Sequence, residues 1–215
     1  YLAAKMRLSA LLGPAGFEIV NADDRAWDAL PPFLRRVTFG ESPDATVRAE
    51  AVFLEAGGSS FRLTGRFGNA EVRIPLMGSF NVSNALAAAA TALALDMPLA
   101  DVVGRLAASP QVPGRMERLA DGPMVVLRDY AHTPDAMTRV LATLRPLTPG
   151  RLVLVFGCGG DRDRGRICGR TRRLGRKPPS GAAGDAGEAR VGGVADRSRL
   201  DHHVVGLTVR QHAGM

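Results

Sequence analysis

The sequence that decides the fold reads Asp129-Tyr130-Ala131-His132-Thr133-Pro134-Asp135 and, further along the chain, Phe156-Gly157-Cys158-Gly159-Gly160-Asp161-Arg162-Asp163-Arg164-Gly165. Each segment follows a short apolar run, Met124 to Leu127 in the first case and Leu152 to Phe156 in the second. Such runs are typical of buried parallel strands. The two polar segments are therefore predicted to be loops at strand ends, where open α/β sheets bind their ligands. This pattern indicates a nucleotide or a phosphorylated intermediate as the ligand.

The composition of the 215 residues is that of a globular protein, with 46% hydrophobic and 23% charged residues. No apolar run approaches the length that spans a bilayer, and the start of the chain has no signal-peptide pattern. Because Tyr1 takes the place of an initiator Met, we expect an N-terminal truncation. The two cysteines lack the paired spacing of a zinc site. We therefore expect a cytoplasmic monomer that binds no membrane.

The net charge of +7 is concentrated at the C-terminal end of the chain. Residues 166–215 contain ten Lys and Arg against four Asp and Glu, and so carry +6 of this charge. The first 165 residues are nearly neutral, and no aromatic residues alternate with the basic ones in the tail. A nucleic-acid partner is therefore not expected.

Hydrophobic periodicity predicts the elements of the first domain, residues 1–112. We expect an α/β domain in which a helix and a strand precede an antiparallel meander, with two more helices after it. The Ala-rich helix is predicted to be capped by Ser83 and Asn84, and the last helix to start at Pro98 and end before Pro110. The first three elements are Tyr1 to Leu12 (helix), Phe17 to Val20 (strand) and Ala45 to Leu76 (meander).

A second domain is predicted over residues 113–165, because a strand–helix–strand pattern opens at Met124. Its crossover helix is expected from Ala136 to Leu147, with Thr133 as the cap. Beyond it the periodicity ends abruptly. We expect residues 166–215 to be a divergent basic tail without order, as a frameshift or an unusual natural extension would produce.

Four motifs together resemble those of the Mur ligase family. They are Gly78-Ser79-Phe80-Asn81-Val82-Ser83-Asn84, Val112-Pro113-Gly114-Arg115-Met116-Glu117 and the two strand-end loops, and they occur in the family's order. The resemblance covers Tyr1 to about Gly165, and it is strongest to the branch that adds the third amino acid of the peptidoglycan stem peptide. It implies an incomplete central ATP-binding domain containing the meander, followed by the start of a Rossmann-like C-terminal ligase domain.

The resemblance also implies a reaction. ATP and Mg²⁺ would be the cofactors, and UDP-N-acetylmuramoyl-L-alanyl-D-glutamate and an amino acid, diaminopimelate or lysine, would be joined through an acyl phosphate. The chain contains no Gly-x-x-x-x-Gly-Lys-Ser/Thr phosphate loop. We therefore expect it to be inactive by itself. Two alternatives stay open: a non-catalytic nucleotide-binding remnant with an anion-binding tail, and a ligase of the folylpolyglutamate synthetase type.

Lys5 is the candidate metal ligand and a candidate catalytic residue. It lies in a segment similar to the one whose lysine is carboxylated in the family, and a carbamate there would bind Mg²⁺ beside the ATP phosphates. Judged without the resemblance, Lys5 is most simply a solvated lysine on a helix.

The resemblance assigns nucleotide contacts to three further residues. Asn81 and Asn84 would face the adenine, and their spacing places both amides on one side of the first helical turn. Arg115 would reach phosphate or ribose oxygens, for which an always-ionised guanidinium is suited. Helix capping for the asparagines and a surface position for the arginine are the alternatives.

The strand-end loops supply the last candidates. By resemblance, Asp129 contacts the ribose or the metal-bound phosphates, and His132 donates to the phosphates or to the developing acyl phosphate. Gly157, Gly159 and Gly160 would let the backbone approach the phosphates closely. A structural role for His132 remains the simpler interpretation of a histidine in a polar loop.

Overall fold

The computed structural model describes residues 2–13, 15–120, 124–148, 150–155 and 205–210. The chain divides into two compact units, Tyr1–Pro110 and Gln111–Met215, and each is described by itself below. The division lies close to residue 112, where the sequence analysis predicts its first domain boundary. None of the helices in these ranges is long and apolar enough to cross a membrane.

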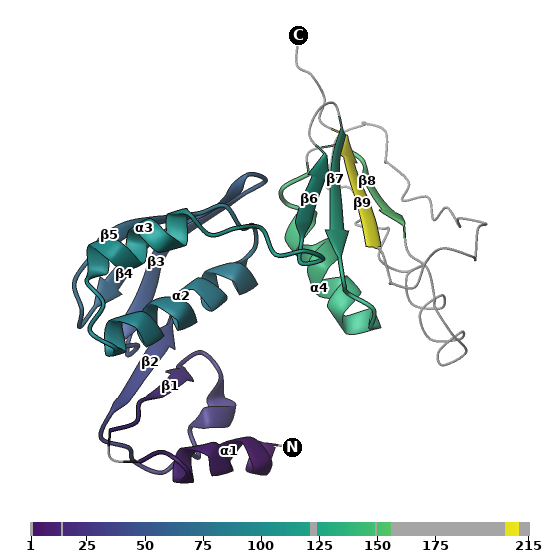
Figure 1. The fold of residues 1–215 in the computed structure, drawn as a ribbon. Helices are drawn as coiled ribbons and strands as arrows, with labels where there is room; N and C mark the ends of the chain where they lie inside the picture. Colours follow the sequence, from purple (N-terminus) through teal and green to yellow (C-terminus); the bar gives the residue numbers. More distant parts are fainter. Residues whose placement is uncertain (1, 14, 121–123, 149, 156–204, 211–215) are drawn as a thin grey trace, which may run out of the picture. The chain divides into compact units, whose positions relative to one another are not determined.

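The first unit is built on a five-stranded mixed sheet with the order β1-β2-β3-β4-β5 (Figure 1). β1 pairs with β2 and β2 with β3 in parallel, whereas β3, β4 and β5 pair antiparallel. The antiparallel meander predicted from period-two alternation is therefore confirmed. The strands are β1 (Glu18–Asn21), β2 (Arg36–Gly40), β3 (Val47–Glu55), β4 (Gly58–Gly65) and β5 (Ala70–Ile74).

Two helices cover this sheet. α2 (Ser79–Ala94) packs against β1 to β4, and α3 (Leu99–Ala107) packs against β5 and α2 (Figure 1). The apolar side chains of α2 recur three or four residues apart, so one face of the helix enters the core. That buried face includes Val82, Leu86, Ala89, Ala90 and Leu93. Both helices were predicted, and Pro98, expected in the first turn of the last helix, is the cap residue directly before α3.

The start of α2 corrects one prediction. The helix begins at Ser79, with Gly78 in the cap position and no side-chain cap. Ser83 and Asn84 therefore lie within the helix and do not cap it. Gly78 has a φ of +97°, a conformation that glycine adopts without strain, so the chain turns into the helix one turn earlier than a Ser or Asn cap would allow.

α1 (Leu2–Ala10) buries none of its residues, and Leu8 and Leu11, which the predicted helical period aligned, are exposed. A polar contact joins the helix to the sheet instead. The Ser9 hydroxyl donates to the carboxylate of Glu18 on β1, which also pairs with Arg36 on β2. Glu18 is 8% exposed, and its ion pair and hydrogen bond compensate for the burial of its charge.

The described residues of the second unit form a four-stranded sheet with the order β6-β7-β9-β8 and the helix α4 (Figure 1). α4 connects β7 to β8, as the predicted strand–helix–strand pattern requires. Thr133 caps it by accepting a hydrogen bond from the N–H of Ala136 at 3.2 Å, which confirms the predicted cap. The elements are β6 (Glu117–Ala120), β7 (Met124–Asp129), α4 (Pro134–Leu144), β8 (Leu152–Val155) and β9 (Val205–Arg210).

β9 corrects two predictions. β7 and β8 were expected to be parallel strands of one sheet, and they do run in the same direction, but each pairs antiparallel with β9 between them. The expectation of a tail without order is wrong for Val205–Arg210, which forms this strand. The physical reason is visible in the sequence: Val205, Leu207 and Val209 alternate with Gly206, Thr208 and Arg210, which is a strand period. The remainder of 166–215 lies outside the described residues.

Candidate functional site

Asp129 lies at the end of β7 and joins two segments that are distant in the sequence. One carboxylate oxygen accepts from the N–H of Met116 at 2.8 Å, and the other accepts from the N–H of Ala131 at 2.8 Å. Next to it, the N–H of Tyr130 donates to the carbonyl of Gly114 at 2.8 Å. Asp129 is 7% exposed, so these bonds are formed away from water. They hold the loop after β7 against the turn before β6.

The turn before β6 has an unusual backbone at Arg115. The residues on either side of it have left-handed conformations, with a φ of +70° at Gly114 and +49° at Met116. For a residue with a side chain, such a conformation costs about 1 kcal/mol or more, and it persists only where the surroundings impose it. Here the Met116 side chain is buried and its N–H is held by Asp129. Arg115, whose side chain is exposed, is therefore attached to a backbone of fixed conformation.

Glu117 holds the same turn from its other side. Its Oε2 accepts from the N–H of Gly114 at 2.7 Å and from Arg128, at 2.8 Å from Nε and 2.6 Å from Nη2. The hydrogen bond from the Gly114 backbone, followed by that from Arg128, lowers the pKa of Glu117 below its ordinary value of 4.5. Sequence reasoning gave no role to Glu117 or Arg128.

Arg115, Tyr130 and His132 form a cluster on the surface of the second unit. The Arg115 guanidinium lies 5.7 Å from the centre of the Tyr130 ring, and the His132 ring lies edge-on to it at 5.0 Å between centres. His132 Nδ1 is 3.0 Å from the carbonyl oxygen of Tyr130. Tyr130 is 46% exposed. The structure therefore brings two predicted site residues together around an aromatic residue that sequence reasoning did not single out.

Asn81 and Asn84 lie in the first two turns of α2, in the other unit. The Asn81 amide donates to the carbonyl of Met77 at 2.9 Å, and the Asn84 amide approaches the Asn81 oxygen at 3.5 Å. Asn81 is buried and Asn84 is exposed. The two amides are on one side of the helix, as their spacing predicts. Capping is excluded as their role, since α2 begins before both of them.

Lys5 is an exposed residue of α1, a helix that belongs to the same unit as the asparagines. Within the described part of the chain, no group of three or more His, Cys, Asp or Glu residues is arranged to hold a metal ion. The three loop glycines, Gly157, Gly159 and Gly160, lie outside the described residues.

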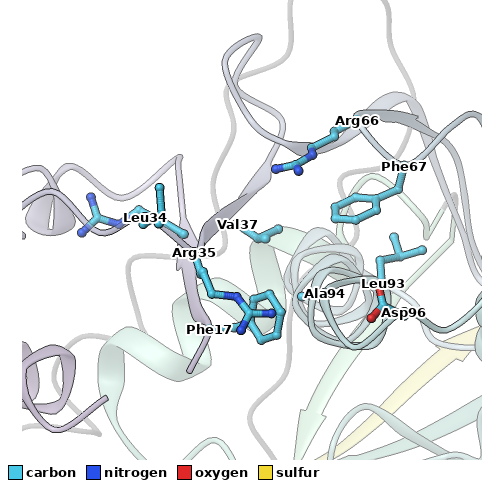
Figure 2. A pocket seen from close by; sticks show the side chains of 10 residues that line it. Phe17, Leu34, Arg35, Val37, Arg66, Phe67, Leu93, Ala94 and Asp96 are labelled. Atoms are coloured by element: carbon cyan, nitrogen blue, oxygen red, sulfur yellow. The ribbon is translucent and has the colours of Figure 1, made fainter. Parts of the chain in front are cut away.

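A pocket of about 250 Å³ occurs in the first unit (Figure 2). Val37 on β2 and Leu93 and Ala94 on α2 line it, with Phe17 and Phe67 around them and Arg35 and Arg66 beside the rings. The Arg35 guanidinium lies 3.8 Å from the centre of the Phe17 ring. No residue predicted to act in the site lines this pocket, so it is separate from the candidate site.

The sequence matches two family models. The Mur ligase middle domain matches residues 1–92, and the Mur ligase glutamate ligase domain matches residues 114–188. The chain belongs to the Mur ligase family, with parts of the central and C-terminal domains in the order that the sequence predicts. The second match extends past Gly165, to residue 188.

Individual relatives point to one branch of this family. The chain is 41% identical over 172 residues to the UDP-N-acetylmuramoyl-L-alanyl-D-glutamate–2,6-diaminopimelate ligase of Thermosynechococcus vestitus, covering 77% of this chain and 35% of the relative. It is 44% identical over 163 residues to the UDP-N-acetylmuramyl-tripeptide synthetase of Roseiflexus sp., covering 71% and 32%.

A solved structure of a UDP-N-acetylmuramoyl-L-alanyl-D-glutamate–2,6-diaminopimelate ligase superposes with a TM-score of 0.60 and 34% identity. The match covers 77% of this chain and 36% of that one. The chain thus spans about a third of the length of the relatives that it matches.

Proposed function

We propose that this chain is part of an ATP-dependent ligase that adds the third amino acid to UDP-N-acetylmuramoyl-L-alanyl-D-glutamate in peptidoglycan synthesis. The incoming amino acid is diaminopimelate or lysine. The names of the similar ligases support this substrate, and so do four motifs in the family's order. We also propose that the protein is a monomer located in the cytoplasm, where ATP and the UDP-linked precursor are available.

The observation that carries the proposal is the fixed cluster of Arg115, Tyr130 and His132. In the described part of the chain, no ion pair involves Arg115, and its guanidinium lies 5.7 Å from the centre of the Tyr130 ring. The carboxylate of Asp129 faces the backbone N–H groups of Met116 and Ala131. A cationic side chain and an imidazole are thus exposed together, and this arrangement fits an anionic ligand such as a nucleotide phosphate.

In the proposed reaction, the D-glutamate carboxylate attacks the γ-phosphorus of ATP, and the amine of the incoming amino acid then displaces phosphate from the acyl phosphate. Arg115 binds phosphate or ribose oxygens, and His132 donates to the oxygens that gain charge. Asn81 and Asn84 contact the adenine. Asp129 keeps the loops in register and can still accept from a ribose hydroxyl through a second lone pair. The catalytic effect comes mainly from positioning and charge stabilisation.

Mg²⁺ is proposed as the cation that neutralises phosphate charge in this family. The described residues hold no preformed cluster of metal ligands, so no step is derived through the metal. Carboxylated Lys5 is kept as the proposed ligand. Gly157, Gly159 and Gly160 are proposed to approach the phosphates through their backbone.

The proposal is tested with a chimera in which residues 1–165 of this chain replace the aligned segment of the Thermosynechococcus vestitus ligase. We expect phosphate release from ATP that requires both the UDP-linked dipeptide and diaminopimelate. The Arg115→Ala chimera should lose most of this activity, while the unmodified parent serves as the positive control. A folded chimera that releases phosphate without either substrate, or never releases it, contradicts the proposal. The 215-residue chain assayed alone should show no turnover, because it contains no phosphate-loop sequence.

A further inference from the structure

The turn that carries Arg115 is closed by a single carboxylate oxygen. Oε2 of Glu117 accepts from the Gly114 N–H at 2.7 Å and from two nitrogens of Arg128, at 2.8 and 2.6 Å. The Glu117 side chain is 18% exposed and that of Arg128 is 38% exposed, so water competes only partly with these bonds. No other side chain is recorded as an acceptor for the Gly114 N–H in the described part of the chain.

We propose that Glu117 is a positioning residue: held by Arg128, it fixes the turn that presents Arg115 to the nucleotide. The nucleotide part of this statement rests on the proposed function. That Glu117 fixes the turn is inferred only from hydrogen bonds within the second unit. The role of the turn and the binding of the nucleotide can therefore be tested separately.

Strand pairing explains how Glu117 reaches both partners. Glu117 is the first residue of β6 and lies opposite Arg128 of β7 in the antiparallel register. Cross-strand neighbours have side chains on the same face, which brings the carboxylate and the guanidinium together. From there, the carboxylate reaches back three residues to the Gly114 N–H. Both neighbours of Arg115 in the sequence are therefore held by hydrogen bonds, Gly114 by Glu117 and Met116 by Asp129.

Gly114 is the position at which this turn would open. Its φ of +70° is accessible to glycine without cost, but glycine also has the largest choice of other conformations. Met116 is held by burial and by Asp129, whereas Gly114 depends on Glu117 and on the bond between its carbonyl and Tyr130. Removing the Glu117 carboxylate should free the backbone of the turn at Gly114 first, while the end of β7 stays in place. The lowered pKa of Glu117 extends its ionised state, which binds Arg128, to more acidic pH.

Trypsin cleavage after Arg115 measures the fixed turn directly, in the complete 215-residue chain. Cleavage requires local opening, so its rate follows the free energy of opening. Glu117→Ala should speed cleavage at Arg115 about tenfold, and Glu117→Gln less, because the amide oxygen can still accept from Gly114. The control is Asp135→Ala, which removes an exposed carboxylate paired with Arg139 and should not change the rate.

Cleavage after Arg139 in α4 serves as the internal reference for the second unit. If Glu117→Ala raises cleavage at both arginines equally, the second unit has loosened as a whole. The comparison of Arg115 with Arg139 is then made in Glu117→Gln. The inference is overturned if the rate at Arg115 stays at the wild-type value in both variants, or if in Glu117→Gln it rises no more than the rate at Arg139.

A double-mutant cycle on MgATP affinity, measured in the chimera with the Thermosynechococcus vestitus ligase, tests whether Glu117 acts through Arg115. Glu117→Ala should weaken MgATP binding about tenfold in the wild-type background and have no further effect when Arg115 is already alanine. Equal weakening in both backgrounds would show that Glu117 acts independently of Arg115 and would overturn the inference. If the folded chimera binds no MgATP, the proposed function fails, while the cleavage comparison in the 215-residue chain still decides whether Glu117 fixes the turn.

Discussion

The carboxylate of Asp129 accepts a hydrogen bond from the backbone N–H of Met116, with 2.8 Å between Oδ2 and the nitrogen. Both residues are buried, at 7% and 3% exposure, and Met116 has a left-handed backbone. The end of β7 therefore imposes a strained conformation on the turn before β6. Arg115 and His132 lie in the two segments that are joined by this contact and by the bond from the Tyr130 N–H to the Gly114 carbonyl.

Replacing Asp129 should lower the stability of the second unit. Asp129→Ala leaves the N–H groups of Met116 and Ala131 without their charged acceptor, at a cost of about 2 to 4 kcal/mol. Asp129→Asn should cost less, because an amide oxygen can still accept one of the two bonds. Urea unfolding of the 215-residue chain measures the change. Asp135→Ala, at an exposed position, should stay within about 0.5 kcal/mol of wild type. Equal effects of Asp129→Ala and Asp135→Ala would show that the buried bonds contribute little.

Glu117 should make stability depend on pH in the acidic range. Its folded-state pKa is lowered by the Gly114 N–H and by Arg128, so its contribution is fully present above the ordinary value of 4.5. That contribution is lost as the pH falls through the lowered folded-state pKa. The stability difference between wild type and Glu117→Gln should be constant above about pH 6 and shrink below about pH 4.5. Thermal unfolding midpoints of both proteins across this range provide the check, and a difference that persists undiminished at about pH 3 is the opposite result.

Strand β9 provides a test of the second sheet. Thr208 pairs with Val126 of β7 on one side and Val153 of β8 on the other, so its strand is interior. Thr208→Pro removes a backbone donor and should destabilise the second unit by about 1 to 3 kcal/mol. Thr208→Ala keeps that donor and is the matched control. Hydrogen exchange should show faster exchange in β7 and β8 for the proline variant only, with β1 to β5 unchanged. Identical exchange in the two variants would mean that β9 does not support the sheet.

Lys5 should matter for chemistry and not for folding. It is exposed on a helix that buries no residue, so Lys5→Ala should leave the unfolding midpoint nearly unchanged. In the chimera with the Thermosynechococcus vestitus ligase, the same change should slow acyl phosphate formation by orders of magnitude, because a metal-bound carbamate acts on the transferring charge.

Arg7→Ala, another exposed change on α1, is the control for this prediction. Added acetate should partly restore the rate of Lys5→Ala by occupying the vacated ligand position. Near wild-type turnover of Lys5→Ala would make Lys5 an ordinary helix lysine.

Local patterns were sufficient to predict much of the fold. Hydrophobic periodicity predicted the meander over Ala45 to Leu76, and Thr133 was predicted as the cap of α4. Both predictions succeeded because strands and helix caps depend on residues close in sequence. β2 was not predicted, since Val37 and Phe39 are only two apolar positions and are recognised as a strand only when β1 and β3 lie beside them. β9 was missed because residues 166–215 were judged by their overall Gly- and Arg-rich composition, which obscured six residues with strand alternation.

The site was predicted less completely than the fold. Arg115 was selected from one motif and Asp129 and His132 from another, and the structure joins the two segments through the bond from Met116 to Asp129 and the contact of Arg115 with Tyr130. The bonds from Met116 to Asp129 and from Gly114 to Glu117 depend on the register of β6 and β7, which no local pattern specifies. Their roles as candidate ATP-binding and catalytic residues stay predictions, as do those of Lys5, the two asparagines and the loop glycines.

One measurement tests the account most directly: the fate of the substrate oxygen in the chimera. UDP-N-acetylmuramoyl-L-alanyl-D-glutamate labelled with ¹⁸O in the reacting carboxylate is incubated with ATP, Mg²⁺ and diaminopimelate, and product and phosphate are examined by mass spectrometry. The account predicts a UDP-linked tripeptide and one labelled oxygen in each phosphate released, because the carboxylate oxygen leaves with the phosphoryl group when the amine attacks. Phosphate without label, or release of phosphate with no tripeptide from a folded chimera, would contradict it.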